Sequence, residues 1–346
     1  MKILHFVHNY FGFSGASRQA KSVVSNIASN YSDIEQRFFT LTASQSQLAS
    51  NDFIVYSSVP NLWSRCWKFL LVLIKFRPEV VHFHGADFAL LLLCKIMGVR
   101  VYWKTTLFGS DDFDTLTRGR GGKVKRFLLR FIDVNNTLTK QIYNVNSRYL
   151  PSSRLVTIPN GVMIPNEGCI QRKSKVAIIM SAIIPRKAVL EGIHFFNEYL
   201  RTHNYTLYVI GPDSSALDGY ERDYVQACHQ LADDQVIFLG ELQHEEALSY
   251  FSKAKFLIHL SRQEGMPNVV LEAMAYAVFP IISDMDGLAN ELISQNKSGI
   301  NIDCVDGIKL PLLMFSNNEG RKAVISNHSF EVVASQTMDV YFGKQQ

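Results

Sequence analysis

The sequence predicts an α/β protein made of two doubly wound, Rossmann-like domains, and three observations support this prediction. The chain has 346 residues, more than a single domain usually contains. It opens with a strand, a glycine-containing loop and a helix, the order found at the start of nucleotide-binding α/β units. Near its middle, Pro159-Asn160-Gly161 ends a further strand with strong turn chemistry, which predicts a domain boundary.

The composition supports a folded protein and limits its partners. With 47% hydrophobic and 19% charged residues, the chain can fill two cores and is not disordered. A net charge of only +4 predicts no attraction of the whole protein to nucleic acid. The five cysteines form no Cys-x-x-Cys pair, which is typical of free thiols in a cytosolic protein. No His/Asp cluster with metal-ligand spacing is evident, so we expect no metal.

Neither a targeting segment nor a membrane-spanning segment is predicted. Met1–Val7 is too short for a secretory signal and is expected to be the first strand. The apolar runs Phe69–Phe76 and Phe88–Met97 are far shorter than the roughly 20 residues that cross a bilayer. We therefore expect a cytoplasmic location.

In the first half, the strand Lys2–His8 precedes the loop Asn9–Ser17, and Arg18–Asn30 has helical spacing. Within the loop, Gly15 lets the backbone approach a diphosphate, although glycines also close many such turns without a ligand. His82-Phe83-His84-Gly85 ends a later strand, and histidines there are as often structural as functional. The other elements predicted in this half are Phe53–Val59, Leu62–Phe76, Glu79–Gly85, Phe88–Met97, Arg100–Thr106, Asp133–Thr137 and Lys140–Tyr149.

A basic stretch runs from Arg118 to Arg130 without any acidic residue. Two interpretations fit this stretch. It is either a solvated basic loop or a patch that rests on an anionic membrane surface. In the second case Leu128, Leu129 and Phe131 add apolar contact if they face outward, whereas the alternative is that they lie in the domain core.

In the second half, the polar linker Pro165–Lys175 leads into the strand Val176–Ile184. The strand Tyr205–Gly211 ends in Gly-Pro, which places Gly211 at the strand's carboxyl end, where α/β sheets bind ligands. The other elements predicted here are Leu190–Leu200, Gln235–Gly240, Glu245–Ser252, Ala254–Leu260, Pro280–Ser283 and a last helix, Glu331–Tyr341, expected to return to the first domain.

The stretch Ser261–Ala275 follows a buried strand and combines an acidic loop with the start of a helix, for which Asn268 is a candidate cap. A helix N-terminus so placed directs backbone N–H groups and a positive dipole end at a phosphate. Glu264 in the loop can reach a sugar hydroxyl, and Glu272 in the helix can accept hydrogen bonds from two ribose hydroxyls. The alternative for such a glutamate is a solvated helix cap.

This stretch, with Glu264 and Glu272 in a Glu-x7-Glu spacing followed by Ala-Met-Ala, resembles the signature of retaining GT-B glycosyltransferases of glycosyltransferase family 4. The strand Pro280–Ser283, the Gly287-Leu-Ala-Asn-Glu291 turn and Ile158-Pro-Asn-Gly-Val162 strengthen the resemblance, which covers nearly the whole chain.

The resemblance implies a GT-B fold, in which two Rossmann-like domains face a central cleft. Residues 1–160, with a crossover helix at about 329–346, are then expected to bind the acceptor. Residues 161–328 are expected to bind the nucleotide-sugar donor.

Site residues also follow from the resemblance. Lys187 matches a lysine that neutralises the leaving diphosphate, and Arg186 can replace an arginine whose position holds Ala182. Phe108 stands where relatives carry a histidine, so that Asp111 or Asp112 is expected to make the polar contacts there. The catalytic residues implied are Glu264, Lys187, Arg186 and Asp111. The nucleotide-binding residues implied are Glu272, Gly15, Gly211, Leu242, Met266, Pro267, Asn268 and Val269.

The implied function is the retaining, metal-independent transfer of a hexose or N-acetylhexosamine, without a cofactor. A UDP-sugar is favoured over a GDP-sugar as donor, and the acceptor is a glycan or a lipid-linked glycan, as in bacterial surface polysaccharide synthesis. A dinucleotide-dependent oxidoreductase is disfavoured because the first βα turn lacks Gly-x-Gly-x-x-Gly. A non-catalytic module that binds nucleotide-sugars or glycans stays open, because Phe108 and Ala182 replace polar residues of the family.

Overall fold

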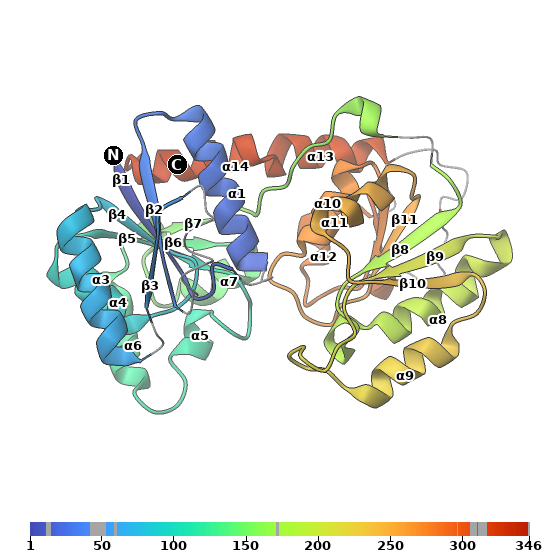
Figure 1. The fold of residues 1–346 in the computed structure, drawn as a ribbon, viewed down its shortest axis with the longest axis horizontal. Helices are drawn as coiled ribbons and strands as arrows, with labels where there is room; N and C mark the ends of the chain where they lie inside the picture. Colours follow the sequence, from blue (N-terminus) through green and yellow to red (C-terminus); the bar gives the residue numbers. More distant parts are fainter. Residues whose placement is uncertain are drawn as a thin grey trace. The chain divides into compact units, whose positions relative to one another are not determined.

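The computed structural model describes residues 1–11, 15–41, 53–58, 61–170, 173–295, 297–304, 310 and 317–344. The chain divides into two compact units (Figure 1). Unit 1 comprises Met1–Gly161 and Phe330–Gln346, and unit 2 comprises Val162–Ser329. The two boundaries, after Gly161 and after Ser329, each lie one residue later in the chain than the domain boundaries expected from the sequence. Of the predicted glycine loop, residues 12–14 lie outside the described residues.

Unit 1 is built on a parallel sheet whose described strands follow the order β3-β2-β1-β4-β5-β6-β7. The order reverses between β1 and β4, as in Rossmann-like sheets. The strands are β1 Lys2–Val7, β2 Glu35–Leu41, β3 Val55–Ser58, β4 Val80–Phe83, β5 Arg100–Thr105, β6 Val134–Thr137 and β7 Leu155–Val156. The helices are α1 Gly15–Asn30, α3 Leu62–Phe76, α4 Phe88–Ile96, α5 Phe113–Leu116, α6 Gly122–Leu128, α7 Lys140–Asn146 and α14 Phe330–Tyr341, with the 3-10 turns η1 Leu129–Phe131 and η2 Ser152–Arg154.

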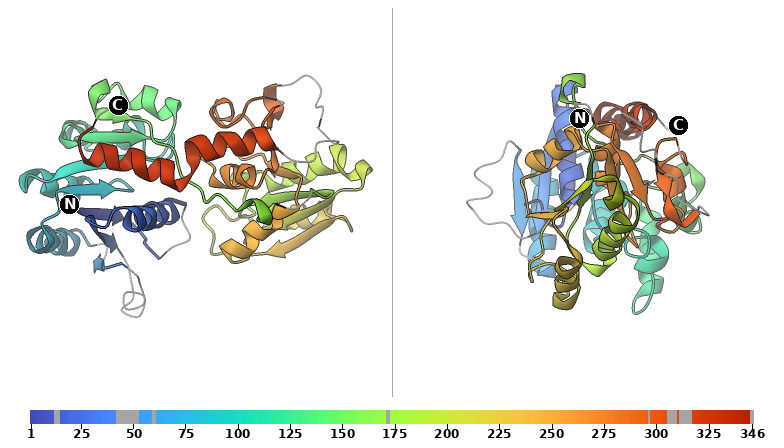
Figure 2. Two further views of the ribbon diagram at one scale, coloured as in Figure 1. Left: turned by 90° about the horizontal axis from the view of Figure 1, so that it is seen from above. Right: turned by 90° about the vertical axis from the view of Figure 1, so that its right-hand side faces the viewer.

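Helices cover both faces of this sheet, so the strands alternate buried side chains between two cores. In β5, Val101 and Trp103 pack toward α3 and α4, whereas Tyr102 packs toward α1 and α14. The last helix, α14, lies against α1 and is part of unit 1 although it follows unit 2 in the sequence (Figure 2). Its Tyr341 lies in the core between these helices and the sheet.

Unit 2 has a second parallel sheet, with the described strands in the order β10-β9-β8-β11-β12-β13. The strands are β8 Val176–Met180, β9 Thr206–Ile210, β10 Val236–Gly240, β11 Phe256–His259, β12 Phe279–Ile282 and β13 Ile300–Asn301. The helices are α8 Val189–Tyr199, α9 Arg222–Leu231, α10 His244–Ser249, α11 Asn268–Ala275, α12 Ala289–Leu292 and α13 Asn318–His328. Short 3-10 turns join them at η3 Glu167–Cys169, η4 Pro185–Lys187, η5 Arg201–His203, η6 Tyr250–Ser252 and η7 Ile302–Cys304.

Most predicted elements are present, and the departures have local causes. The sequence did not predict β2, α9 or α13, which are polar over much of their length. Asn268 is the first residue of α11 and Pro267 holds the cap position, so the expected Asn268 cap was wrong. The basic stretch is helical from Gly122 onward rather than a loop. Among the described residues, none of the helices combines the length and the apolar character needed to cross a membrane.

Strand pairing in unit 1 gathers three histidines that the sequence did not group. His5 in β1 lies in register with His82 in the neighbouring β4, and His84 follows on the same side. The ligand nitrogens of the three rings all lie within 4.8 Å of one another. The expectation that no such cluster exists was therefore wrong, because its spacing arises across two strands and not along the chain.

Hydrogen bonds and ring stacking hold this histidine cluster. Nδ1 of His5 lies 3.2 Å from Nε2 of His84, and Nε2 of His5 lies 3.1 Å from Oε1 of Gln36. Nδ1 of His82 lies 2.5 Å from the hydroxyl of Tyr341, which ties β4 to α14. The rings of His82 and His84 stack with centroids 3.8 Å apart. A ligating nitrogen points its lone pair within the ring plane, so these two stacked rings do not aim at one point.

The first prediction concerns acid. Burial lowers the pKa of His5 to about 3 and lowers the pKa values of His82 and His84 well below 6.5. Below about pH 6.5 the unfolded chain takes up protons on these groups that native unit 1 does not bind, so stability falls as the pH falls. Each histidine contributes about 2 kcal/mol to the expected loss between pH 7 and pH 5.

Urea unfolding followed by tryptophan fluorescence measures this loss in unit 1, because all three tryptophans of the chain lie there. His84→Asn should reduce the pH dependence by about one histidine's share, or about 2 kcal/mol over the same range. The control is His203→Asn, an exposed histidine of unit 2. A pH dependence that His84→Asn leaves unchanged would contradict the assignment.

Candidate active site

The candidate site of unit 2 forms where two neighbouring strands end. β8 and β11 pair in parallel, so the loops at their carboxyl ends meet at one edge of the sheet. The loop after β8 passes through the turn Pro185–Lys187 into α8, and the loop after β11 runs into α11. This pairing brings together basic and acidic residues that are 77 positions apart in the sequence.

Arg186 fastens the two loops to each other. Its carbonyl oxygen accepts hydrogen bonds from the backbone N–H of Arg262 at 2.9 Å and from the hydroxyl of Ser261 at 3.2 Å. Its guanidinium Nη1 donates to the carbonyl of Gln263 at 3.0 Å. The contacts described for Arg186 therefore serve to position the acidic loop.

Lys187 and Glu264 form a mostly buried ion pair at this edge. Nζ of Lys187 lies 2.5 Å from Oε1 of Glu264, and Nε2 of His259 lies 3.3 Å from the same oxygen. Burial alone would raise the pKa of Glu264, but the neighbouring His259 ring and the Lys187 charge together lower it well below the ordinary value. The carboxylate is therefore ionised and holds the ammonium group of Lys187 in place.

The backbone after Lys187 adopts a conformation that normally favours glycine. Ala188 has φ +50° and ψ +43°, in the left-handed region. It is both the C-cap of η4 and the N-cap of α8. Such a conformation costs an alanine about 1–2 kcal/mol. The Ala188 side chain is buried in the core.

The start of α11 lies next in the same loop. Pro267 and Asn268 begin the helix, whose first backbone N–H groups point out of its N-terminal end. Met266 and Val269 pack against one hydrophobic cluster together with Leu242, from the loop after β10. Three predicted nucleotide-binding residues therefore pack against the same core cluster.

Glu272 lies in the second turn of α11 and is 9% exposed. Its Oε1 is 3.4 Å from Nε2 of His244, the first residue of α10. Neither His244 nor His259 was predicted as a site residue. His259 carries a weak signal, since it is the polar end of an otherwise apolar strand, but only the fold shows that both histidines face the motif glutamates.

Gly211 directly follows β9 and lies close to Ser181, which directly follows β8. The backbone N–H of Ser181 donates to the carbonyl of Ile210 at 2.9 Å, and that of Gly211 donates to the carbonyl of Gly240 at 2.8 Å. With φ at +149°, a Cβ on Gly211 would lie 2.1 Å from the carbonyl oxygen of Ser181. Glycine is therefore required here by the close packing of the strand ends, whether or not a ligand binds.

The two remaining predicted residues, Gly15 and Asp111, belong to unit 1. Gly15 is the exposed first residue of α1. Oδ1 of Asp111 accepts from the backbone N–H groups of Thr106 and Leu107 at 3.0 and 2.6 Å, and Oδ2 accepts from the Thr106 hydroxyl at 2.7 Å. Burial raises the pKa of Asp111, an effect that these hydrogen bonds oppose. The carboxylate therefore closes its own loop.

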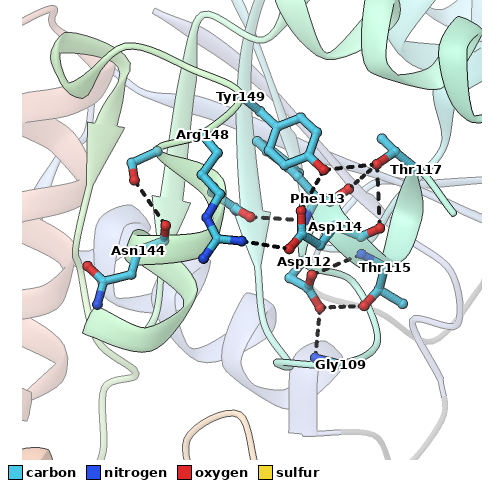
Figure 3. Close-up of polar contacts among 11 residues, drawn as sticks. Gly109, Asp112, Phe113, Asp114, Thr115, Thr117, Asn144, Arg148 and Tyr149 are labelled. Atoms are coloured by element: carbon cyan, nitrogen blue, oxygen red, sulfur yellow. Dashed lines mark hydrogen bonds and ion pairs between the residues drawn. The ribbon is translucent and has the colours of Figure 1, made fainter.

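The neighbouring Asp112 is equally committed to local structure. Its carboxylate accepts from the backbone N–H of Gly109 at 2.7 Å and from that of Thr115 at 3.0 Å, which caps α5 (Figure 3). Asp114 in the same helix contacts Arg148 at 3.1 Å and the Tyr149 hydroxyl at 2.5 Å (Figure 3). The polar residues of this segment thus hold the loop after β5 in one shape.

Comparison with known proteins finds similarity to glycosyltransferases. Residues 164–312 match the family model described as Glycosyl transferases group 1. A segment of 96 residues, 27% of the chain, is 33% identical to 26% of an alpha-1,4-N-acetyl-D-galactosaminyltransferase of Campylobacter jejuni named for a PP-undecaprenol-linked glycan. An uncharacterized glycosyltransferase of Methanocaldococcus jannaschii is 23% identical over 73% of the chain and 63% of its own length. The chain thus spans less than two thirds of these curated relatives.

Solved structures resemble the chain over its full length. HepE of Anabaena in complex with UDP has a TM-score of 0.77 at 15% identity, covering 99% of this chain and 100% of that one. The lipopolysaccharide outer core galactosyltransferase WaaB, in its apo form, has a TM-score of 0.70 at 14% identity, covering 100% of both chains. At this level of identity the similarity shows the fold, and the chain has the GT-B fold.

The second prediction tests the close approach at Gly211. Gly211→Ala should destabilise the protein by about 3 kcal/mol or more, because the backbone of Ser181 must move to admit the methyl group. Gly240→Ala is the matched control, since Gly240 also ends a strand with positive φ but has nothing within 4 Å of a Cβ, and it should cost only about 1–2 kcal/mol. Urea unfolding followed by circular dichroism compares them, and equal losses would contradict the packing explanation.

Proposed function

We propose that the chain is a retaining, metal-independent glycosyltransferase that moves a hexose or N-acetylhexosamine from a UDP-sugar to a glycan or lipid-linked acceptor. The observation that carries the proposal is the Lys187–Glu264 ion pair, fixed at 2.5 Å at the carboxyl edge of the unit 2 sheet. It lies within the segment that matches Glycosyl transferases group 1. A lysine held at such an edge, beside a helix N-terminus, suits a departing diphosphate.

Unit 2 supplies the contacts proposed for the donor. The backbone N–H groups at the start of α11 face the diphosphate, and Glu272 accepts hydrogen bonds from the ribose hydroxyls. Leu242, Met266 and Val269, which pack against one core cluster, are proposed to lie beside the base. HepE, which this chain resembles in fold, was solved in complex with UDP, and this supports uracil as the base of the donor.

Charge stabilisation is the proposed contribution to the chemistry. As the bond between the anomeric carbon and the diphosphate oxygen breaks, Lys187 and the amides of Asn268 and Val269 stabilise the growing negative charge. A new bond forms to the acceptor oxygen on the same face of the sugar, and the acceptor proton passes to the departing phosphate. Glu264 orients Lys187, with which it is paired, and the sugar hydroxyls.

Arg186 and Asp111 take positioning roles in this proposal. The described contacts of Arg186 join the two loops of unit 2, and those of Asp111 close a loop in unit 1. The acceptor is proposed to bind unit 1. An undecaprenol-linked glycan in the name of the Campylobacter relative and the lipopolysaccharide in that of WaaB support a surface glycan as acceptor.

Incubation with labelled UDP-sugars and GDP-sugars tests the proposal. Transfer or slow hydrolysis of one donor is expected, and NMR of the anomeric proton in a transfer product reads out whether configuration is retained. Binding without turnover of any donor would instead favour a non-catalytic binding module. Inversion at the anomeric carbon would refute the retaining mechanism and leave the transfer itself intact.

The third prediction concerns Lys187. Lys187→Ala should lower kcat about 100-fold or more, because a preorganised positive charge is lost from the transition state. Lys175→Ala, which removes an exposed lysine of unit 2 bonded to the carbonyl of His203, is the control and should retain activity. Thermal unfolding of both variants separates loss of activity from loss of fold. A larger effect of Arg186→Ala than of Lys187→Ala would exchange the two proposed roles.

The fourth prediction concerns Glu272. Glu272→Gln should weaken UDP binding about tenfold, since a charged acceptor of ribose hydroxyls becomes neutral, while kcat at saturating donor changes little. His244→Gln is the companion variant, because His244 is the described partner of Glu272 and should produce a smaller effect in the same direction. Titration calorimetry with UDP measures both. An unchanged affinity of Glu272→Gln for UDP would show that Glu272 does not bind the nucleotide.

A further inference from the structure

Three neighbouring helices of unit 1, α3, α4 and α6, lie on one side of its sheet (Figure 1). Their inner sides fill a single core, to which Phe69 of α3, Leu91 of α4 and Leu129 just after α6 contribute. Their outer sides together form what we call the α3–α4–α6 face. Both the apolar and the charged residues of this face are unusual for a surface in water.

Large apolar side chains project from the α3–α4–α6 face. In α3, Trp63 is 84% exposed and Trp67 is 63% exposed, and their spacing of one helical turn places both on the same side as Ile74. Further exposed apolar residues occur on all three helices and just after α4. They are Leu62 of α3, Leu92 and Ile96 of α4, Met97 just after α4, and Val124 and Phe127 of α6.

The charge of this face has a single sign. The segments Leu62–Phe76, Phe88–Ile96 and Gly122–Phe131 contain no aspartate or glutamate. They carry the basic residues Arg65, Lys68, Lys75, Lys95, Lys123, Lys125, Arg126 and Arg130. Of these, Arg65 pairs with Asp87, the buried cap of α4, at 3.3 Å. The cations of Lys95 and Arg130 lie over the rings of Phe131 and Phe127, at 5.7 and 5.9 Å from the ring centres.

We propose that the α3–α4–α6 face docks on an anionic membrane surface. Tryptophan rings favour the boundary between lipid and water, and clustered lysines and arginines bind anionic headgroups. The longest of the three helices, α3, has 15 residues and is amphipathic, so it is suited to lie along the surface and not to cross it. This docking does not depend on the sugar-transfer proposal, because it needs neither donor nor acceptor.

The structure also decides which residues supply the apolar contact. The sequence left two alternatives for Leu128, Leu129 and Phe131, which either face outward or lie in the domain core. Leu129 is fully buried, and Leu128 and Phe131 pack against the same core. The outward apolar residues of this segment are instead Val124 and Phe127, and the aromatic anchors come from α3, far away in the sequence.

The fifth prediction tests this surface with the full chain and lipid vesicles. Sedimentation should recover at least about tenfold more protein with vesicles containing about 30% phosphatidylglycerol than with phosphatidylcholine alone, and the excess should shrink between about 50 and 500 mM salt. Brominated lipids should quench tryptophan fluorescence, because two of the three tryptophans are exposed on the face. The third, Trp103, is fully buried.

Two pairs of variants locate the contact. Trp63→Ser with Trp67→Ser should reduce binding about tenfold, as should Lys123→Glu with Arg126→Glu. Matched changes in unit 2, Met163→Ser for the exposed apolar residue and Lys253→Glu for the charge, should leave binding unchanged. Thermal unfolding confirms that each variant is folded.

Other outcomes would overturn the proposal. Equal recovery on neutral and anionic vesicles, or binding unaffected by the tryptophan and charge variants, rules out docking through this face. A dimer in solution that Trp63→Ser with Trp67→Ser abolishes, together with no vesicle binding, would assign the face to a second copy of the chain. Vesicle sedimentation and tryptophan quenching use no sugar donor, so a failure of the sugar-transfer proposal would not change their results.

Discussion

The pairing of β8 with β11 is the constraint on which the candidate site depends. It sets Lys187 against Glu264, and each charge makes the burial of the other tolerable. An ionised carboxylate is costly to bury without such partners. His259 contacts the same Glu264 carboxylate, and Arg186 holds the loop that carries it. A shift of one residue between these strands would separate the pair and misplace the start of α11.

Local patterns were sufficient to predict most of the fold. Buried parallel strands are short apolar runs, and amphipathic helices such as α3 show apolar residues at helical spacing. The α/β class and most element positions therefore followed from the sequence. β2, α9 and α13 escaped because their stability comes from neighbours: β2 begins Glu35-Gln-Arg yet pairs with strands on both sides. Tertiary context overrides such weak local signals.

The candidate site was predictable only where a motif carried it. Glu264, Glu272 and Lys187 stand in a recognisable string, and the structure gives each a described partner. His244 has no local signal and His259 has only a weak one, because their role arises from strands and helices that meet in space. The histidine cluster of unit 1 was not predicted for the same reason, because the pairing of β1 with β4 brings its members together. Asp111, which the sequence aligned with a ligand contact, makes its described hydrogen bonds within its own loop, and no local pattern indicated them.

The position of α14 has a consequence for the order in which the chain folds during synthesis. This helix supplies Tyr341 to the core of unit 1, yet the ribosome makes it only after all of unit 2. At about 5–20 residues per second, unit 1 waits on the order of ten seconds or more with one face of its sheet covered by α1 but not yet by α14. Unit 2, which is continuous in sequence, can complete first. Unit 1, most of which precedes unit 2 in the sequence, is thus the last of the two units to finish.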